Sequence, residues 1–309
     1  MAKFLVIGTM AWDRVIRLEK SLIVGARIHA QNALCADGEV LDGRLGGAAA
    51  NASAALINAG NEVAVFAGLP LDQIGDRILK DGDRLGLDLT LVRRIPVPRA
   101  LTIVLVTPEG ERTIIGVSPN PKHDHANWRA ALMECEPLSI PDLERVAPDG
   151  VYLRAALPGS ACLSRIKDTR IVAQWSLPDQ LTDIPVEVFI ASADDLGSEL
   201  NPGKLIERAI AISGDHFRGF VVTEGAEGGC VYTPENTFRY ASPRVDQRDA
   251  TGAGDSFAAG LLEALVAGAD LREAVDHGAE WGAIAASHGG CLQDYRPALF
   301  PGYSLQPLP

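Results

Sequence analysis

The sequence predicts an α/β fold in which helices flank a central, mostly parallel sheet and a smaller β-rich part projects from it. Short apolar runs bounded by glycine or turn residues recur along the chain, which is typical of strands buried on both faces. Helical stretches separate several of these runs and indicate βαβ units. Two β-rich segments interrupt the alternation and predict the projecting part.

Six apolar runs are the predicted strands of the parallel sheet. The first, KFLVIG, is continuously apolar and ends at a glycine, and the others repeat this pattern. The six runs are Lys3–Gly8, Asn61–Gly68, Asp149–Arg154, Thr169–Gln174, Val186–Ala191 and Phe217–Gly225.

Three stretches are predicted helices. Ala48–Gly60 is rich in alanine and ends in glycine, which is a helix stop signal. Gly197–Gly214 carries apolar residues at helical spacing, and Asp255–Gly268 does the same through Phe257 and Leu261. Their positions between or after strands fit the βαβ alternation.

The two β-rich segments lack intervening helices. Residues 13–45 contain the short pieces RVIRLE and RIHAQNALC, and residues 100–117 form a hairpin signal around Pro108-Glu109-Gly110. Together they predict a small antiparallel sheet that projects from the main domain. An extra edge hairpin is the alternative.

Composition limits the classes of partner and the compartment. The 309 residues contain 28 basic and 40 acidic side chains, and a net charge of −12 argues against nucleic acid as a partner. Five scattered cysteines without a CxxC pair favour free thiols over disulfides or a metal site. Neither a signal peptide nor an apolar run of about 18 residues is present, so we expect a soluble cytoplasmic protein without a membrane partner.

Two nucleotide-binding motifs are missing. The sequence contains no GxxxxGK[ST], so it is not a P-loop enzyme. The first predicted strand is followed by GTMAWD instead of GxGxxG, which argues against a dinucleotide-dependent oxidoreductase.

The stretch GAGD, Gly252–Asp255, places glycines and an acid where a helix begins. The first N–H groups of a helix have no intrahelical partner, and small residues leave that end open to an anion. A carboxylate at the same end can accept a proton from a substrate hydroxyl, and the two functions together serve phosphoryl transfer. The alternative is that Asp255 is an N-cap acid beside an ordinary turn.

Three stretches together carry a family resemblance. GGAAANASAALINAG (Gly46–Gly60), TEGAEGG (Thr223–Gly229) and DATGAGDSFAAG (Asp249–Gly260) resemble the PfkB carbohydrate kinase family, the ribokinase-like sugar and nucleoside kinases. The resemblance covers most of the chain in the expected order. It implies one ribokinase-like domain over residues 1–309, with a β-stranded lid over the substrate at approximately 13–45 and 96–118.

The resemblance also implies residue roles in the transfer step. Asp255 matches the general base that deprotonates the acceptor hydroxyl. Gly252, Ala253 and Gly254 match the anion hole, whose backbone N–H groups face the transferred phosphate. Mg²⁺ is expected on the ATP phosphates.

Further positions match binding residues of the family. Asp13 matches an acid that binds sugar hydroxyls, Gly46 and Gly47 open the loop where substrate approaches, and Asn51 matches a hydroxyl-binding amide. The nucleotide element matches at Thr223, Gly225 and Gly228, and a potassium site matches at Asp249 and Thr251.

One family motif is altered. Many relatives carry N-x-x-E, which organises Mg²⁺ through water, whereas this chain has Ser192-x-x-Asp195 with Glu199 as an alternative acid. We expect Asp195 to take the role, with a shorter side chain. The change also leaves open a non-catalytic nucleotide or sugar sensor on the same scaffold.

The acceptor class depends on indirect signals. Arg14, Arg44 and Arg154 form no basic cluster in the sequence, which favours a neutral sugar or related polyol over a phosphosugar. A nucleoside is the alternative, because Trp12 and Trp175 are candidates for stacking on a base, or else for the core. Exposed strand edges of the lid predict a homodimer in which two lids pair.

Overall fold

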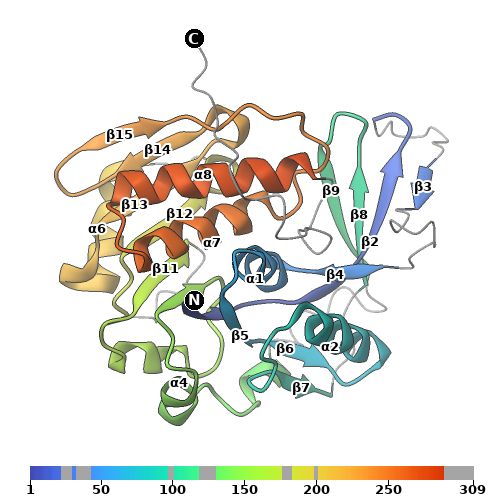
Figure 1. The fold of residues 1–309 in the computed structure, drawn as a ribbon, viewed down its shortest axis with the longest axis horizontal. Helices are drawn as coiled ribbons and strands as arrows, with labels where there is room; N and C mark the ends of the chain where they lie inside the picture. The colour runs from blue at the N-terminus through green and yellow to red at the C-terminus, as the bar shows by residue number, and fades with distance from the viewer. Residues whose placement is uncertain are drawn as a thin grey trace.

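The computed structural model describes residues 1–21, 30–32, 43–96, 101–117, 130–175, 183–197 and 201–288 (Figure 1). In this part of the chain, an eight-stranded sheet has the order β15-β14-β13-β12-β11-β10-β1-β5. The strands from β5 to β13 pair in parallel, and β14 and β15 pair antiparallel at one edge. The bounds are β1 Lys3–Ile7, β5 Glu62–Phe66, β10 Gly150–Leu153, β11 Arg170–Gln174, β12 Val188–Ser192, β13 Gly219–Thr223, β14 Gly229–Tyr232 and β15 Thr237–Tyr240. The six predicted strands are confirmed.

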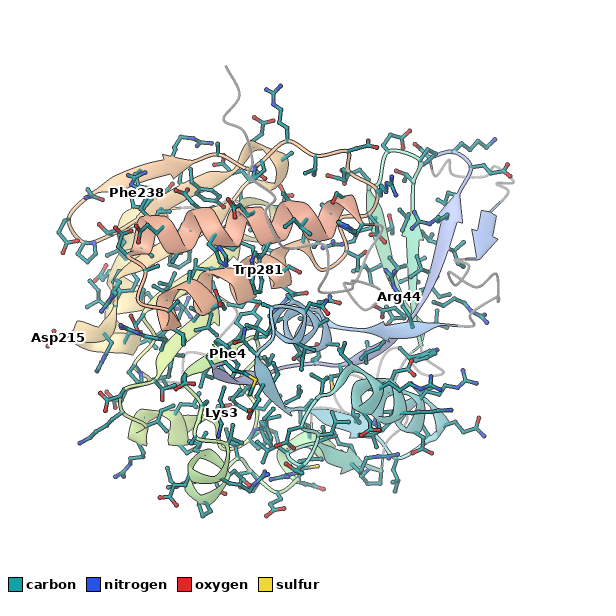
Figure 2. All side chains as sticks on the ribbon, in the orientation of Figure 1. Lys3, Phe4, Arg44, Asp215, Phe238 and Trp281 are labelled. Atoms are coloured by element: carbon teal, nitrogen blue, oxygen red, sulfur yellow. The ribbon has the colours of Figure 1, made fainter. Side chains whose placement is uncertain are left out.

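The two faces of this sheet bury two separate cores. Along β1, Phe4 and Val6 belong to one hydrophobic cluster, whereas Leu5 and Ile7 belong to the other. This alternation follows from the period of two along a strand, and burial on both faces explains the continuous apolar run. Phe4 and Trp281, which both belong to the first cluster, are labelled in Figure 2.

Helices cover both faces of the sheet. On the first face lie α1 (Ala48–Asn58), α7 (Ala253–Val266) and α8 (Leu271–Ser287) (Figure 1). The helices α7 and α8 approach closely where Gly278 has no side chain. A Cβ added to Gly278 would lie only 2.7 Å from the Phe257 carbonyl oxygen. Further helices among the described residues are α2 (Gln73–Leu85), α4 (Ile140–Val146), α5 (Ala193–Leu196) and α6 (Pro202–Ser213).

The three predicted helices are confirmed: α1 begins at Ala48 as predicted, and the other two begin at different residues. The last predicted helix begins two residues early, at Ala253, so Asp255 lies inside its first turn. The middle one begins at Pro202 because the Asn201 side chain caps α6 by accepting from the Lys204 N–H. A further amphipathic helix, α2, is capped by Asp72 and ends at Gly86 in a left-handed conformation.

A second sheet is built from the two β-rich segments. It has the order β3-β2-β8-β9, and β4 also pairs with β2. The predicted hairpin is confirmed, since β8 and β9 pair antiparallel around a turn in which Gly110 N donates to Thr107 O. Its strands are β2 Ala11–Leu18, β3 Ala30–Asn32, β4 Arg44–Gly46, β8 Leu101–Val106 and β9 Arg112–Val117. The remaining residues of the predicted lid, 22–29, 33–42, 97–100 and 118, lie outside the described residues.

The second sheet is mixed, so the expectation of a purely antiparallel sheet was wrong. Its central strands, β2 and β8, pair in parallel from Asp13 opposite Thr102 to Arg17 opposite Val106. A long excursion through α1, β5 and α2 separates them in the chain, so no hairpin determines their relative direction. A two-stranded sheet of β6 (Gly68–Pro70) and β7 (Arg93–Ile95) completes the described strands.

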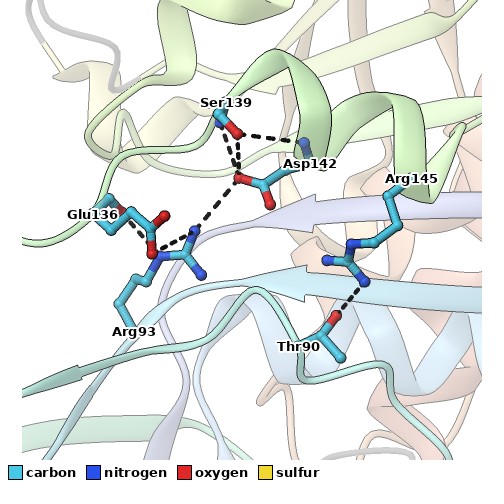
Figure 3. A network of polar contacts seen from close by, with 6 residues as sticks. All are labelled: Thr90, Arg93, Glu136, Ser139, Asp142 and Arg145. Atoms are coloured by element: carbon cyan, nitrogen blue, oxygen red, sulfur yellow. Dashed lines mark hydrogen bonds and ion pairs between the residues drawn. The ribbon is translucent and has the colours of Figure 1, made fainter.

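Polar contacts attach α4 and the loop before it to β7 (Figure 3). Arg93 donates through Nε to the Glu136 carbonyl at 2.9 Å and pairs with Asp142 at 3.5 Å. Asp142 also completes a capping box with Ser139 at the start of α4. The network therefore joins α4 to β7.

The described helices and three described cysteines bear on the expectations about membrane spans and thiols. Among the described residues, none of the helices combines the length and apolar character needed to cross a bilayer. Cys135, Cys162 and Cys230 are free thiols.

Candidate active site

The predicted general base lies at the start of α7 and does not cap it. Gly252, with φ of 79°, occupies the N-cap position, and no side chain caps the helix. Asp255 is the third residue of α7, and its side chain is 17% exposed. Its carboxylate is directed to another helix, so the N-cap alternative does not describe this residue.

Asn51 of α1 holds the Asp255 carboxylate. The Asn51 Nδ2 donates to Oδ2 of Asp255 at 3.0 Å. The helix α1 starts after Gly47, whose φ of 86° turns the chain from β4 into the helix, and the Ala49 N–H donates to the Thr9 carbonyl beyond β1. The segment after β1 therefore contacts the start of α1, and α1 brings Asn51 to Asp255.

Burial and charge act in opposite directions on the Asp255 carboxyl. Burial raises its pKa above the ordinary value, and it is the largest influence. The hydrogen bond from Asn51 and the positive charges of Arg154 and Arg112 oppose the shift without reversing it. A carboxylate whose pKa is raised is a stronger base than one exposed to water.

Three arginines that are distant in the sequence converge on the loop before α7. Arg154, directly after β10, lies 3.7 Å from Oδ1 of Asp255. Arg112 of β9 donates to the Ala250 carbonyl, and Arg44 of β4 pairs with Asp249 at 3.3 Å. The absence of a basic cluster in the linear sequence thus does not hold in the folded chain.

The predicted acceptor residues gather beside Asp255. Asp13 of β2 is buried, and a side chain on Gly46 would collide with its Oδ2. Gly47 packs in the same way on the Thr9 carbonyl, because a Cβ added to this glycine would lie 2.6 Å from the carbonyl oxygen. Asp13, Gly46, Gly47 and Asn51 are therefore brought together, and the glycines permit the close approach.

Several buried polar atoms of these segments lack a hydrogen-bond partner among the described residues: Trp12 Nε1, Asn51 Oδ1 and Thr251 Oγ1. Buried polar atoms are rarely left unsatisfied in native proteins. Because Asn51 Oδ1 belongs to the amide that contacts Asp255, it indicates a ligand site beside this carboxylate. Trp12 itself packs at the edge of the core, with Arg77 stacked 5.8 Å from its ring centroid.

A cavity of about 420 Å³ joins the predicted nucleotide element to the predicted anion hole. Thr223 and Gly225 line one side, and Ala253 and Gly254 line another. Small residues of α8 form a further wall: Ala279, Gly282, Ala283 and Ala286. Gly228 is not among the lining residues; its φ of 85° and its packing against the Tyr240 carbonyl shape the turn behind them.

The predicted metal-binding residues lie in different settings. Asp195 is exposed in α5, three residues after Ser192, which pairs with Thr223 across β12 and β13. A single exposed acid at this edge fits Mg²⁺, which retains waters and binds mainly through nucleotide phosphates. The described residues contain no cluster of three or more metal-ligating side chains, and the alternative acid Glu199 lies outside them.

Asp249 and Thr251 contact each other in the loop before α7. Asp249 is fully buried, and its Oδ1 accepts from the Thr251 N–H at 2.9 Å while Oδ2 faces Arg44. Trp175, the other stacking candidate, makes edge-to-face contacts with Phe189 and Phe220 in the second core.

Comparisons with known proteins show the family of the chain. The sequence profile described as pfkB family carbohydrate kinase matches residues 1–298. An ATP-dependent ribose-1-phosphate kinase from Halopiger xanaduensis is 26% identical over 251 residues, covering 79% of this chain and 81% of the relative. Aminoimidazole riboside kinase from Salmonella typhimurium is 25% identical over 271 residues, covering 80% and 83%.

The fold is shared with a solved ribokinase. The structure of Arabidopsis thaliana ribokinase complexed with ribose and ATP aligns with a TM-score of 0.66 at 22% identity, covering 95% of this chain and 96% of that chain. The chain therefore belongs to the pfkB family of carbohydrate kinases, has a ribokinase-like fold, and is an ATP-dependent phosphotransferase with a hydroxyl group as acceptor.

Proposed function

We propose that the chain transfers the γ-phosphoryl group of ATP to a hydroxyl of a small sugar or related polyol, with Asp255 as the general base. The observation that carries the proposal is the position of the Asp255 carboxylate. It lies mostly buried in the first turn of α7, is held by Asn51, and is next in sequence to Gly254, which lines the same cavity as Thr223. A base and an anion-binding helix start then face the same reacting group.

The chain's own groups divide the work of the transfer. Asp255 accepts the proton of the attacking hydroxyl, and Asn51 fixes which carboxylate oxygen faces away from the substrate. The backbone N–H groups of Gly252–Gly254 hold the charge that develops on the transferred phosphate. Mg²⁺ bound to ATP neutralises phosphate charge, and Asp195 would hold it through water.

The acceptor would be bound by the buried polar atoms beside the base. Asn51 Oδ1 is an acceptor for a hydroxyl of a small molecule bound next to Asp255. Asp13 adds a carboxylate that suits further hydroxyls. We propose that the second sheet, which carries Trp12 and Asp13 on β2, acts as a lid that excludes water during transfer.

A phosphorylated sugar is a second candidate acceptor. Arg154 lies 3.7 Å from the base, and Arg112 contributes positive charge to the same carboxyl. Guanidinium groups are suited to bind phosphate bidentately, and a relative is named for ribose 1-phosphate. The name of the Salmonella relative equally supports a riboside as acceptor.

A substrate panel tests these acceptors. Purified protein with ATP and Mg²⁺ is offered neutral sugars, nucleosides and sugar phosphates, and ADP release is measured. We expect ADP release with at least one class. Thermal stabilisation by ligands without ADP release across the panel would instead support the sensor.

Arg154 distinguishes neutral from phosphorylated acceptors. With a phosphorylated acceptor, Arg154→Met should raise the acceptor KM by at least about tenfold, because a charge-assisted contact is lost. With a neutral acceptor, the KM should change little. Arg165→Met, an exposed arginine away from the site, is the control.

We further propose a homodimer formed through β9. All six residues of this edge strand are exposed, including Ile114 and Ile115. An exposed apolar edge strand is prone to pair with another strand, and a second copy of the same lid offers one.

The free thiols fit the reducing cytoplasm that we propose as the compartment.

A further inference from the structure

The ion pair between Arg44 and Asp249 lies at the loop just before the proposed anion hole. Asp249 is fully buried, and it precedes Gly252, the N-cap of α7, by three residues. Arg44 reaches it from β4 of the second sheet, with Nη2 at 3.3 Å from Oδ2. Figure 2 labels Arg44 on the side of the molecule where the second sheet lies.

Both oxygens of the Asp249 carboxylate are engaged within the chain. Oδ1 accepts from the Thr251 N–H at 2.9 Å, and Oδ2 faces the guanidinium. The Ala286 carbonyl is also engaged, because it accepts from the N–H groups of Arg248 at 2.9 Å and Asp249 at 3.2 Å. These contacts fix the backbone of the loop that leads into Gly252.

The resemblance implies a potassium site at Asp249 and Thr251, and the residues present do not fit one. A buried carboxylate needs a countercharge, and a cation or a guanidinium can each supply it. Here the guanidinium already does so. A potassium ion at the same carboxylate would lie next to a second positive charge in a poorly solvated place, where like charges repel strongly.

We propose that the Arg44 guanidinium is a built-in cation beside Asp249, which takes the place of a monovalent cation and lets the anion hole form without potassium. This inference rests on the proposed role of the Gly252–Gly254 loop. Arg44 is then a positioning residue that acts through Asp249. It also connects the loop to the acceptor-binding strand, because Arg44 pairs with Asp13 across β4 and β2.

Cation dependence is measured in two ways, by turnover and by melting temperature. Each is recorded in KCl, NaCl and tetramethylammonium chloride at equal ionic strength. For the unsubstituted protein, we expect the three salts to give the same turnover within about twofold and the same melting temperature. The melting temperature remains informative even when no acceptor is phosphorylated, so failure of this inference is separable from failure of the proposed function.

Arg44→Ala should make the turnover depend on potassium. Removing one partner leaves a buried carboxylate without a countercharge, so turnover in tetramethylammonium chloride should fall at least about tenfold. KCl should then restore part of the turnover and raise the melting temperature, with saturation. Arg44→Lys keeps the charge and should remain independent of the salt.

Arg170→Ala combined with Arg218→Ala is the matched control. Both arginines pair with the buried Glu187, at 3.0 and 3.1 Å, near the start of β11. Their loss should lower stability equally in the three salts. A stability effect without any difference between potassium and tetramethylammonium is therefore the result of a merely structural pair.

Three results would overturn the proposal. The first is unsubstituted protein that needs potassium for turnover or is specifically stabilised by it. The second is folded Arg44→Ala protein with normal turnover in every salt. The third is Arg44→Ala protein that potassium restores neither in fold nor in turnover, as expected if Arg44 instead binds an anionic substrate.

Discussion

The amide of Asn51 and the carboxylate of Asp255 form a 3.0 Å hydrogen bond although 204 positions separate them in the chain. The bond joins the first turns of α1 and α7, which pack so closely that a side chain on Gly252 would lie 3.0 Å from Asn51 Cγ. The orientation of the proposed base therefore depends on α1, the helix that also carries the proposed acceptor-binding residue Asn51.

Asn51→Leu should change the pH dependence of turnover. The hydrogen bond favours the ionised carboxylate, so its loss raises the pKa of Asp255 further. The acid limb of the kcat/KM profile should move to higher pH, and turnover at neutral pH should fall. Asn58→Leu, at the other end of α1, should leave the limb in place. An unchanged limb in Asn51→Leu would mean that Asp255 does not govern it.

Asp255→Asn should not cost stability. Burial raises the pKa of Asp255, so ionisation is less favourable in the folded than in the unfolded chain. That cost is absent below about pH 4, the ordinary pKa, and grows as pH rises through the folded-state pKa. The variant should melt at or above the unsubstituted protein at pH 7, and the difference should shrink toward pH 4. A clear drop in melting temperature at pH 7 would contradict this.

Two glycines of the same motif should respond differently to alanine. Gly252 has φ of 79°, where an L-residue costs roughly 1–2 kcal/mol, and the new Cβ would also press on Asn51. Gly254 faces open space and lines the cavity. Gly252→Ala should lower the unfolding midpoint in urea, whereas Gly254→Ala should keep it and raise the KM for ATP. Equal midpoints for the two variants would count against the described loop.

A charge on β9 should prevent lid pairing. Ile114 is 58% exposed on this edge strand, and a lysine there would place like charges together in a symmetric pair. Sedimentation should show dimer for the unsubstituted protein and monomer for Ile114→Lys. Leu71→Lys, an equally exposed apolar position outside the second sheet, should remain dimeric. Unsubstituted protein that is monomeric at working concentrations would refute the dimer.

Local signals explain which parts of the fold could be predicted from the sequence. Buried strands such as β1 have continuous apolar runs, and α1 ends at a glycine, so both follow from short stretches of chain. The parallel pairing of β2 with β8 could not be predicted, because a hairpin signal specifies only the local antiparallel pair β8–β9.

The convergence of three arginines near α7 could not be predicted from the sequence, for a different reason. Arg44, Arg112 and Arg154 lie in three unrelated segments, and only tertiary packing brings them to the loop before α7. Sequence spacing contains no signal for such a convergence. A helix start near Gly252–Asp255 was predictable from the motif, whereas Arg44 as the partner of Asp249 was not.

The turnover of Asp255→Asn with ATP, Mg²⁺ and the best acceptor of the panel tests the role of Asp255 as the general base most directly. We expect kcat to fall by a factor of at least about 10², because general base catalysis contributes that much, while ATP affinity and fold are retained. Turnover near that of the unsubstituted protein, at normal ATP affinity, would contradict the assignment of Asp255 as the base.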